Sequence, residues 1–153
     1  MRGLVILGST GSIGQQTLDI VRAFPDRFKV LGLAAGRNLE LLARQVQEFR
    51  PASVYYAKDG GRELLPHDGW QYTPMEEMVQ APLVDTVMVG TVGRAGLLPT
   101  LAAINARKSV ALANKEVIVM AGNIVMAEAR RNGVEVLPVD SEPSAMWQCM
   151  RGE

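Results

Sequence analysis

The sequence has 153 residues, of which 48% are hydrophobic and 21% charged, a length and composition that suit one domain with a proper core. Its 16 basic and 16 acidic residues leave a formal net charge of zero, so we expect neither nucleic acid nor an anionic membrane surface as a partner. The single cysteine excludes an internal disulfide and a cysteine-rich zinc site, and it favours a reducing, cytoplasmic location.

Short apolar runs alternate with segments of helical periodicity along the chain. The pattern predicts strands over residues 4–7, 28–35, 53–57, 85–89, 109–113 and 134–139. Helices are predicted over residues 13–24, 39–49, 96–107 and 120–132, with a further short helix opened by Pro74 and a loop over 58–70. None of the apolar runs reaches the roughly 18 residues that a membrane span needs, so no membrane association is expected. The alternation predicts an α/β, Rossmann-like fold, with a mostly parallel sheet covered by helices on both faces.

A glycine-rich turn, Gly8-Ser9-Thr10-Gly11-Ser12-Ile13-Gly14, lies between the first predicted strand and the first predicted helix. At that junction Gly8 permits a tight turn, Gly11 lets the backbone approach a pyrophosphate, and Gly14 lets the helix pack closely. The free amides of the helix N-terminus can donate to the anion, as can the hydroxyls of Thr10 and Ser12. The spacing is G-x-x-G-x-x-G and not the commoner G-x-G-x-x-G, so a turn with packing duties alone is the alternative. The position favours a dinucleotide site.

The residues after the second predicted strand indicate which dinucleotide would bind. An enzyme that uses NAD places an acidic residue here to bind the ribose 2′-hydroxyl, whereas this sequence reads Ala35-Gly36-Arg37-Asn38. Arg37 can pair with a 2′-phosphate, and Gly36 and Asn38 offer close polar contacts. The pattern therefore favours NADP(H) over NAD(H). In the alternative interpretation Arg37 is a solvated residue at the start of a helix.

Two carboxylates follow the last predicted strand. Asp140 and Glu142 would lie at the carboxyl end of the sheet, where both can direct oxygens toward a hard cation. The alternative is a helix N-terminus, because Ser141 can cap a helix, Pro143 suits a first turn and acidic residues favour the helix dipole.

Four segments in the same order resemble 1-deoxy-D-xylulose 5-phosphate reductoisomerases: the glycine-rich turn and residues 34–38, 112–116 and 137–142. The resemblance covers essentially the whole chain but only the N-terminal part of the family's length. It implies an NADP-dependent, metal-dependent oxidoreductase of non-mevalonate isoprenoid synthesis. Such an enzyme uses NADPH and a divalent cation (manganese, magnesium or cobalt) to convert 1-deoxy-D-xylulose 5-phosphate to 2-C-methyl-D-erythritol 4-phosphate. A sugar-phosphate substrate and a possible homodimer are implied with it.

The resemblance also implies roles for individual residues. Lys115 and Ser141 would contact substrate, and Asp140 and Glu142 would ligate the metal, so that Lys115, Ser141 and Glu142 form the catalytic set. The implied cofactor-binding residues are Thr10, Gly11, Ser12, Ile13, Gly36, Arg37, Asn38, Asn114 and Glu116. From the residues alone, Asn114 is equally a helix N-cap and Lys115 a solvated charge.

The resemblance divides the chain into two parts. Residues 1–139 would form the NADPH-binding, Rossmann-like domain, and residues 140–153 would begin a truncated metal- and substrate-binding catalytic domain. The family's third metal carboxylate, its phosphate-binding residues and its active-site lid come later, so we expect this chain alone to be inactive. Pro143 replaces a residue that is typically polar in relatives, which alters the turn beside Glu142.

Two other function classes fit parts of the sequence. Semialdehyde dehydrogenases that act on acyl phosphates carry a similar glycine turn, but they need a nucleophilic cysteine, and Cys149 is expected to be a buried, inert thiol. A non-catalytic NADPH-binding module would bind the cofactor without any effect of divalent metal or sugar phosphate.

Overall fold

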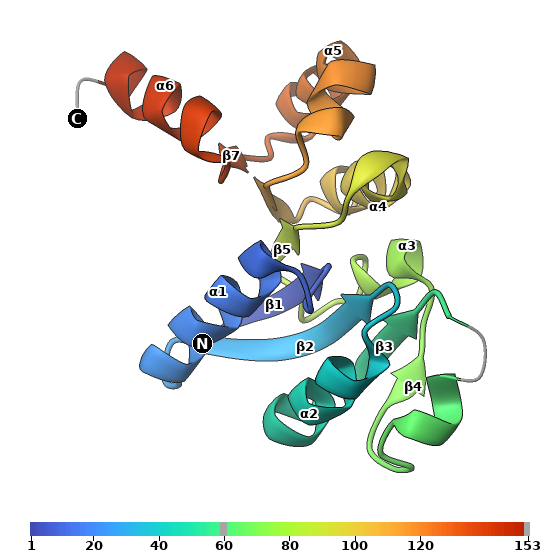
Figure 1. Ribbon diagram of the computed structural model, residues 1–153. Helices are drawn as coiled ribbons and strands as arrows, with labels where there is room; N and C mark the ends of the chain where they lie inside the picture. Colours follow the sequence, from blue (N-terminus) through green and yellow to red (C-terminus); the bar gives the residue numbers. More distant parts are fainter. Residues whose placement is uncertain (59–60, 152–153) are drawn as a thin grey trace.

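The computed structural model describes residues 1–58 and 61–151, and it describes the side chains of all of these except residues 142, 143 and 151 (Figure 1). The strands are β1 (Arg2–Leu7), β2 (Phe28–Ala35), β3 (Ser53–Tyr56), β4 (Gln71–Tyr72), β5 (Thr86–Val89), β6 (Ser109–Leu112) and β7 (Val136–Pro138). The helices are α1 (Ser12–Ala23), α2 (Leu39–Phe49), α3 (Met75–Met78), α4 (Leu97–Asn105), α5 (Lys115–Asn132) and α6 (Ser141–Arg151). Two short 3₁₀ turns, η1 (Gly61–Leu64) and η2 (Gly93–Gly96), complete the described elements.

The strands form one sheet in the order β4-β3-β2-β1-β5-β6-β7, and every neighbouring pair is parallel. The chain builds the sheet outward from β1 through β2 and β3 to β4, and then returns to the other side of β1 with β5. In the register, Ile6 lies opposite Leu33 of β2 and opposite Met88 of β5. The order therefore reverses between β1 and β5, which is the place where open α/β sheets bind ligands beyond the carboxyl ends of their strands.

Helices cover both faces of the sheet, and side chains alternate between the two faces along the central strand. Leu4 and Ile6 of β1 pack into a core cluster with α1 and α2, whereas Val5 and Leu7 pack into a second cluster with α3, α4 and α5. Leu4 is 8% exposed and the other three are fully buried, as expected for a strand covered on both sides. The α6 helix belongs to neither cluster and extends from β7 away from the sheet (Figure 1). The predicted α/β, Rossmann-like architecture is thus confirmed.

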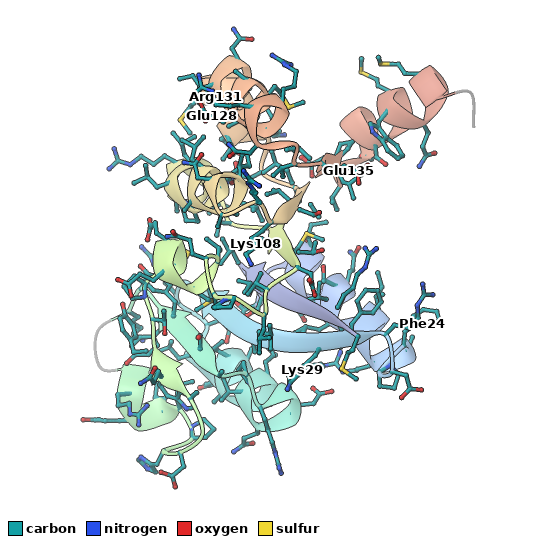
Figure 2. The ribbon with its side chains drawn as sticks, turned by 180° about the vertical axis from the view of Figure 1, so that it is seen from behind. Phe24, Lys29, Lys108, Glu128, Arg131 and Glu135 are labelled. Atoms are coloured by element: carbon teal, nitrogen blue, oxygen red, sulfur yellow. The ribbon has the colours of Figure 1, made fainter. Side chains whose placement is uncertain are left out.

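The α5 helix differs from the prediction, because it begins at Lys115 and not at Met120. The Asn114 side chain caps its first turn, and Ala121 has non-helical backbone angles (φ −146°, ψ 22°), so α5 is two helical segments joined at a kink. The apolar periodicity of the sequence identified only the second segment. The helix ends as predicted at Gly133 in the left-handed region (φ 64°). Near that end an ion pair between Glu128 and Arg131 lies on the outer side of α5 (Figure 2).

Within residues 1–58 and 61–151, no helix combines the length and the apolar character that crossing a bilayer requires.

The buried central strand gives a direct stability prediction. Ile6→Ala removes a fully buried side chain from β1, so it should lower the free energy of unfolding by about 2–5 kcal/mol. Ile20→Ala makes the same chemical change on α1 at a side chain that is 53% exposed, and it should change that free energy by no more than about 0.5 kcal/mol. Urea unfolding followed by circular dichroism measures both, and equal effects of the two substitutions would contradict the assigned core.

Candidate cofactor and substrate site

The glycine-rich turn is anchored to the neighbouring strand by its own backbone. The amides of Gly8 and Ser9 both donate to the carbonyl oxygen of Ala34 in β2, at 2.8 and 2.9 Å, and the amide of Gly11 donates to the carbonyl of Gly8 at 3.0 Å. Gly8 has φ +85°, which favours glycine, and a Cβ added there would overlap the carbonyl of Gly90 after β5. The turn is therefore held against β2 on one side and against the end of β5 on the other.

The α1 helix begins with no side chain capping its first turn. Its N-cap residue is Gly11, so its first amides receive no side-chain acceptor from the described chain, in contrast to those of α2 and α5, which asparagines cap. Gly11 and Ser12 are exposed, and Thr10 and Ile13 are partly buried. An uncapped helix N-terminus that is open to solvent can donate hydrogen bonds to an anion. The structure thus leaves these predicted phosphate-binding residues available.

Gly36, Arg37 and Asn38 follow β2 directly and are all exposed. Asn38 caps α2, because its Oδ1 accepts a hydrogen bond from the amide of Leu41 at 3.1 Å. The side chain of Arg37 forms no hydrogen bond or ion pair with any described residue. A guanidinium without a partner among the described residues, in a segment without a carboxylate, is suited to a ligand that carries a phosphate.

A groove joins the turn to this segment at the carboxyl edge of the sheet. It has a volume of about 160 Å³. Its lining consists mainly of small and apolar residues from the ends of β1, β2, β3 and β5, namely Gly8, Ala34, Ala35, Gly36, Tyr55, Ala57, Met75, Thr91, Val92 and Ala95. The groove lies at the point where the strand order reverses, and this location connects the two parts of the predicted cofactor site.

Asn114 is buried, being 2% exposed, and its side chain is fully engaged within the protein. Its Oδ1 accepts from the amide of Val117 at 3.2 Å, which caps α5. Its Nδ2 donates to the carbonyl of Gly93 at 2.9 Å and to Oγ1 of Thr91 at 3.3 Å. The side chain therefore acts as the predicted N-cap and also holds the loop after β5. The sequence analysis did not identify Thr91 or Gly93.

Lys115 and Asp140 line a second cavity, of about 380 Å³, next to Asn114. They reach it from neighbouring strands, because β6 and β7 pair side by side with Leu112 opposite Pro138, and each strand is followed by one of these charged residues. Asn114 also lines it, and the remaining lining is apolar and includes Ile118, Val119, Met126, Val136, Met146, Trp147 and Met150. The structure thus places the ammonium group of Lys115 and the carboxylate of Asp140 at one cavity whose walls are mostly apolar. Glu116 is exposed on the first turn of α5 and does not line it.

The predicted metal ligands lie where β7 passes into α6. Asp140 is partly buried, and its carbonyl accepts the amide of Ser144 at 2.9 Å, so it stands at the N-terminus of α6. Ser141 is the first residue of α6 and is exposed. Glu142 belongs to the same helix, but its side chain lies outside the described residues. Among the described side chains, His, Cys, Asp and Glu residues form no group of three or more that could hold a metal ion.

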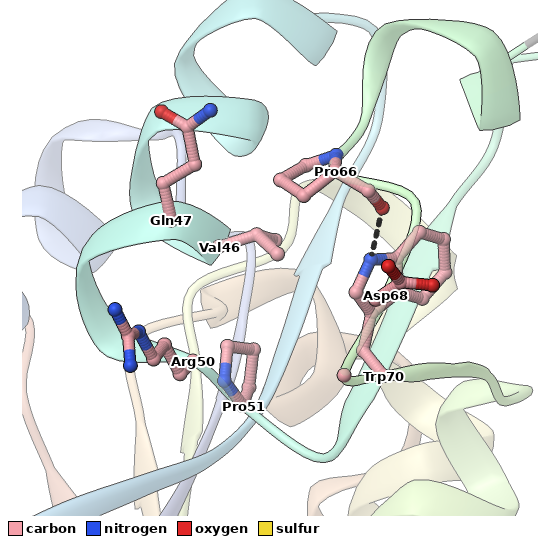
Figure 3. Close-up of a pocket in the computed structure, with 8 residues that line it drawn as sticks. Val46, Gln47, Arg50, Pro51, Pro66, Asp68 and Trp70 are labelled. Carbon is pink, nitrogen blue, oxygen red and sulfur yellow. Dashed lines mark hydrogen bonds between the residues drawn. The ribbon is translucent and has the colours of Figure 1, made fainter.

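A larger hollow, of about 450 Å³, lies at the opposite edge of the sheet (Figure 3). It is formed where α2 ends and the chain enters β3 and β4, and there the indole Nε1 of Trp70 donates to the carbonyl of Pro66 at 2.7 Å. No predicted site residue lines this hollow, and parallel α/β sheets bind ligands at the carboxyl edge. We therefore assign the site to the carboxyl edge in spite of the hollow's larger volume.

Cys149 is exposed, so the expectation of a buried thiol is wrong. The residue lies on α6, which belongs to neither core cluster and therefore leaves part of its surface uncovered.

Comparison with known sequences identifies the family of the chain. The family model described as 1-deoxy-D-xylulose 5-phosphate reductoisomerase matches residues 4–122. The reductoisomerase of Pelotomaculum thermopropionicum is 48% identical over 163 residues, which cover 99% of this chain and 42% of that protein. The reductoisomerase of Geobacillus kaustophilus is 45% identical over 160 residues, which cover 100% of this chain and 42% of that protein. The chain thus spans about two fifths of the length of these curated relatives.

Solved structures agree with this finding. A crystal structure of DOX-P reductoisomerase in complex with magnesium is 37% identical, with a TM-score of 0.91 over 97% of this chain and 40% of that one. The same enzyme in complex with NADPH, fosmidomycin and magnesium gives a TM-score of 0.90 at 37% identity, over 97% of this chain and 39% of that one. A homoserine dehydrogenase from Thiobacillus denitrificans shares the fold alone, at 22% identity and a TM-score of 0.61 over 89% of this chain and 28% of that one.

The two asparagine caps differ in burial, which yields a second prediction. Asn114→Ala removes the α5 cap and also leaves the partly buried carbonyl of Gly93 without its side-chain donor, so it should lower the free energy of unfolding by about 2–3 kcal/mol. Asn38→Ala removes one exposed cap bond and should lower it by about 1 kcal/mol. Urea unfolding compares the two variants, and an Asn114→Ala effect no larger than that of Asn38→Ala would contradict the assigned second bond.

Proposed function

The chain belongs to the 1-deoxy-D-xylulose 5-phosphate reductoisomerase family, and from that premise we propose that it is the NADPH-binding part of such an enzyme. The complete protein would convert 1-deoxy-D-xylulose 5-phosphate to 2-C-methyl-D-erythritol 4-phosphate in non-mevalonate isoprenoid synthesis. This chain alone would bind the cofactor but would not catalyse the reaction.

One observation supports the proposal most directly. The groove at the reversal of the strand order is lined by Gly8 of the glycine-rich turn and by Gly36. The turn leads into the start of α1, which no side chain caps, and Gly36 precedes Arg37, whose guanidinium pairs with no described residue. A dinucleotide with a 2′-phosphate carries negative charge at both of the corresponding places, the pyrophosphate and the ribose. The groove and its two donors therefore match NADPH better than NADH.

In this proposal two segments of the chain bind different parts of the cofactor. Thr10, Gly11, Ser12 and Ile13 hold the pyrophosphate with the first amides of α1, and Gly11 allows the close approach. The Gly36–Asn38 segment holds the adenosine end, with Arg37 on the 2′-phosphate.

The residues beyond β6 would face the nicotinamide end. Asn114 would act mainly through its cap, because its side-chain amide is already bonded within the protein. Glu116, which is exposed on the first turn of α5, remains available for a direct contact. NADPH itself would supply the hydride, and the protein would supply its orientation.

The cavity beside this end would receive the sugar phosphate and a divalent cation. Lys115 would bind the anionic substrate at the cavity wall, with Ser141 contacting it from the start of α6. Asp140 provides hard carboxylate oxygens suited to magnesium, and we propose that Glu142 joins it as a ligand. When bound, the cation would act as a Lewis acid on the substrate's carbonyl. The apolar walls would exclude water from the reacting groups.

Three further features extend the proposal beyond the cofactor. We place the protein in the cytoplasm, because its single cysteine suits a reducing compartment. We expect a homodimer of the complete protein, as the family resemblance implies. We divide the chain into a cofactor domain at 1–139 and the start of the catalytic domain at 140–153.

The cofactor assignment is tested by measuring the dissociation constants of NADPH and NADH at fixed salt concentration. The parent chain should bind NADPH at least about 10-fold more tightly than NADH, because a charge-assisted bond to the 2′-phosphate contributes roughly 1.5–3 kcal/mol. Arg37→Asp should remove that preference. Arg44→Asp makes the same charge change at an exposed position of α2 outside the groove, and it should keep the preference. Equal affinity of the parent for the two cofactors would refute the role of Arg37.

A further inference from the structure

Ser9 and Gln45 form a fully buried polar pair that joins the glycine-rich turn to α2. Ser9 is 0% exposed and Gln45 is 2% exposed. Oγ of Ser9 donates to Oε1 of Gln45 at 2.8 Å, and Nε2 of Gln45 donates back to the carbonyl of Ser9 at 2.9 Å. The side-chain amide of Gln45 thus forms hydrogen bonds with both the side chain and the backbone of Ser9, which lies 36 positions earlier in the sequence.

Burial alone does not account for a glutamine at this position. Gln45 lies on the core-facing side of α2, which it shares with buried Leu42 and Val46, and an apolar residue there would fill the core equally well. A buried amide needs partners of fixed geometry, and both of its ends find them in Ser9. What the glutamine adds to packing is therefore a fixed orientation of the turn relative to the helix.

The pair links the glycine-rich turn to the helix that follows the Gly36–Asn38 segment. Ser9 lies inside the turn, between Gly8 and Thr10, and so the turn cannot move relative to α2 without breaking these bonds. The α2 helix starts directly after the Gly36–Asn38 segment, whose Asn38 caps it. The distance between the pyrophosphate donors and the adenosine donors is thereby tied to this buried side-chain contact, in addition to the backbone bonds from Gly8 and Ser9 to Ala34.

We propose that Gln45 is a positioning residue for the cofactor. By holding Ser9, it fixes the spacing between the start of α1 and the Gly36–Asn38 segment, so that a single NADPH can contact both. This inference rests on the proposed function, since it concerns the same cofactor, and it adds a residue that does not itself touch the ligand.

Comparing how a substitution of Gln45 changes the binding of two ligands distinguishes a positioning role from a general effect on stability. NADPH spans both ends of the groove, whereas 2′-AMP, which lacks the pyrophosphate, would contact only the Gly36–Asn38 segment. Gln45→Met keeps the length of the side chain and removes both hydrogen bonds. We expect the dissociation constant of NADPH to rise about 10-fold, equivalent to about 1.4 kcal/mol, and that of 2′-AMP to change less than about 2-fold. Gln47→Met, the same substitution at an exposed position of α2, should change neither.

A second variant covers the case in which Gln45→Met does not fold. Ser9→Ala removes one bond and keeps the backbone bond from Gln45, so it should weaken NADPH binding by a smaller factor, about 3-fold, with 2′-AMP again unaffected. Where both variants fold, the double variant should bind NADPH no more weakly than Gln45→Met alone, because the two residues act through one contact.

The outcomes separate this inference from the proposed function. If the parent chain binds no NADPH, the proposed function fails, and this inference with it. If the parent binds NADPH and the variants bind it equally well, or if both ligands weaken by the same factor, the positioning role is overturned while the cofactor assignment stands.

Discussion

The close approach of α1 to the carbonyl of Gly8 determines the shape of the carboxyl edge of the sheet, where the groove lies. A Cβ added at Gly14 would overlap that carbonyl and come within 2.5 Å of the Cα of Ser9, so a side chain there would force the helix away from the turn. A Cβ added at Gly8 would likewise overlap the carbonyl of Gly90, and the positive φ of Gly8 also favours glycine. The contact holds the start of α1, which no side chain caps, against the turn whose Gly8 lines the groove.

Polar burial is concentrated at the same edge. The buried polar side chains of the described residues are Ser9, Gln45, Thr100 and Asn114. Ser9 and Gln45 fix the turn after β1, and Asn114 fixes the loop after β5. Thr100 donates to the carbonyl of Gly96 at 2.6 Å, in the 3₁₀ turn that follows this loop. The protein therefore uses apolar packing to form the sheet layers and buried hydrogen bonds to set the loops that would face the ligand.

The sequence predicted the features that depend on local chemistry. Strand and helix alternation, the glycine turn and the N-cap interpretation of Asn114 each follow from neighbouring residues, and the structure has all three. The partners of Asn114 were not predictable, because Thr91 and Gly93 lie 23 and 21 positions away. The exposure of Cys149 depends on which element covers α6, and periodicity carries no such information. One signal was available but not used: Gln45 interrupts an apolar helix face, which indicates a buried partner.

The central claim is that one groove at the carboxyl edge holds NADPH through the start of α1 and the Gly36–Asn38 segment. Amide chemical shifts of the isotope-labelled chain, followed by nuclear magnetic resonance during NADPH titration, locate the bound ligand directly. We predict that shifts concentrate at Ser12, Ile13 and the Gly36–Asn38 segment and leave Gly69 and Trp70 at the opposite edge unchanged. Shifts centred on Trp70, or an absence of shifts at saturating NADPH, would contradict the account.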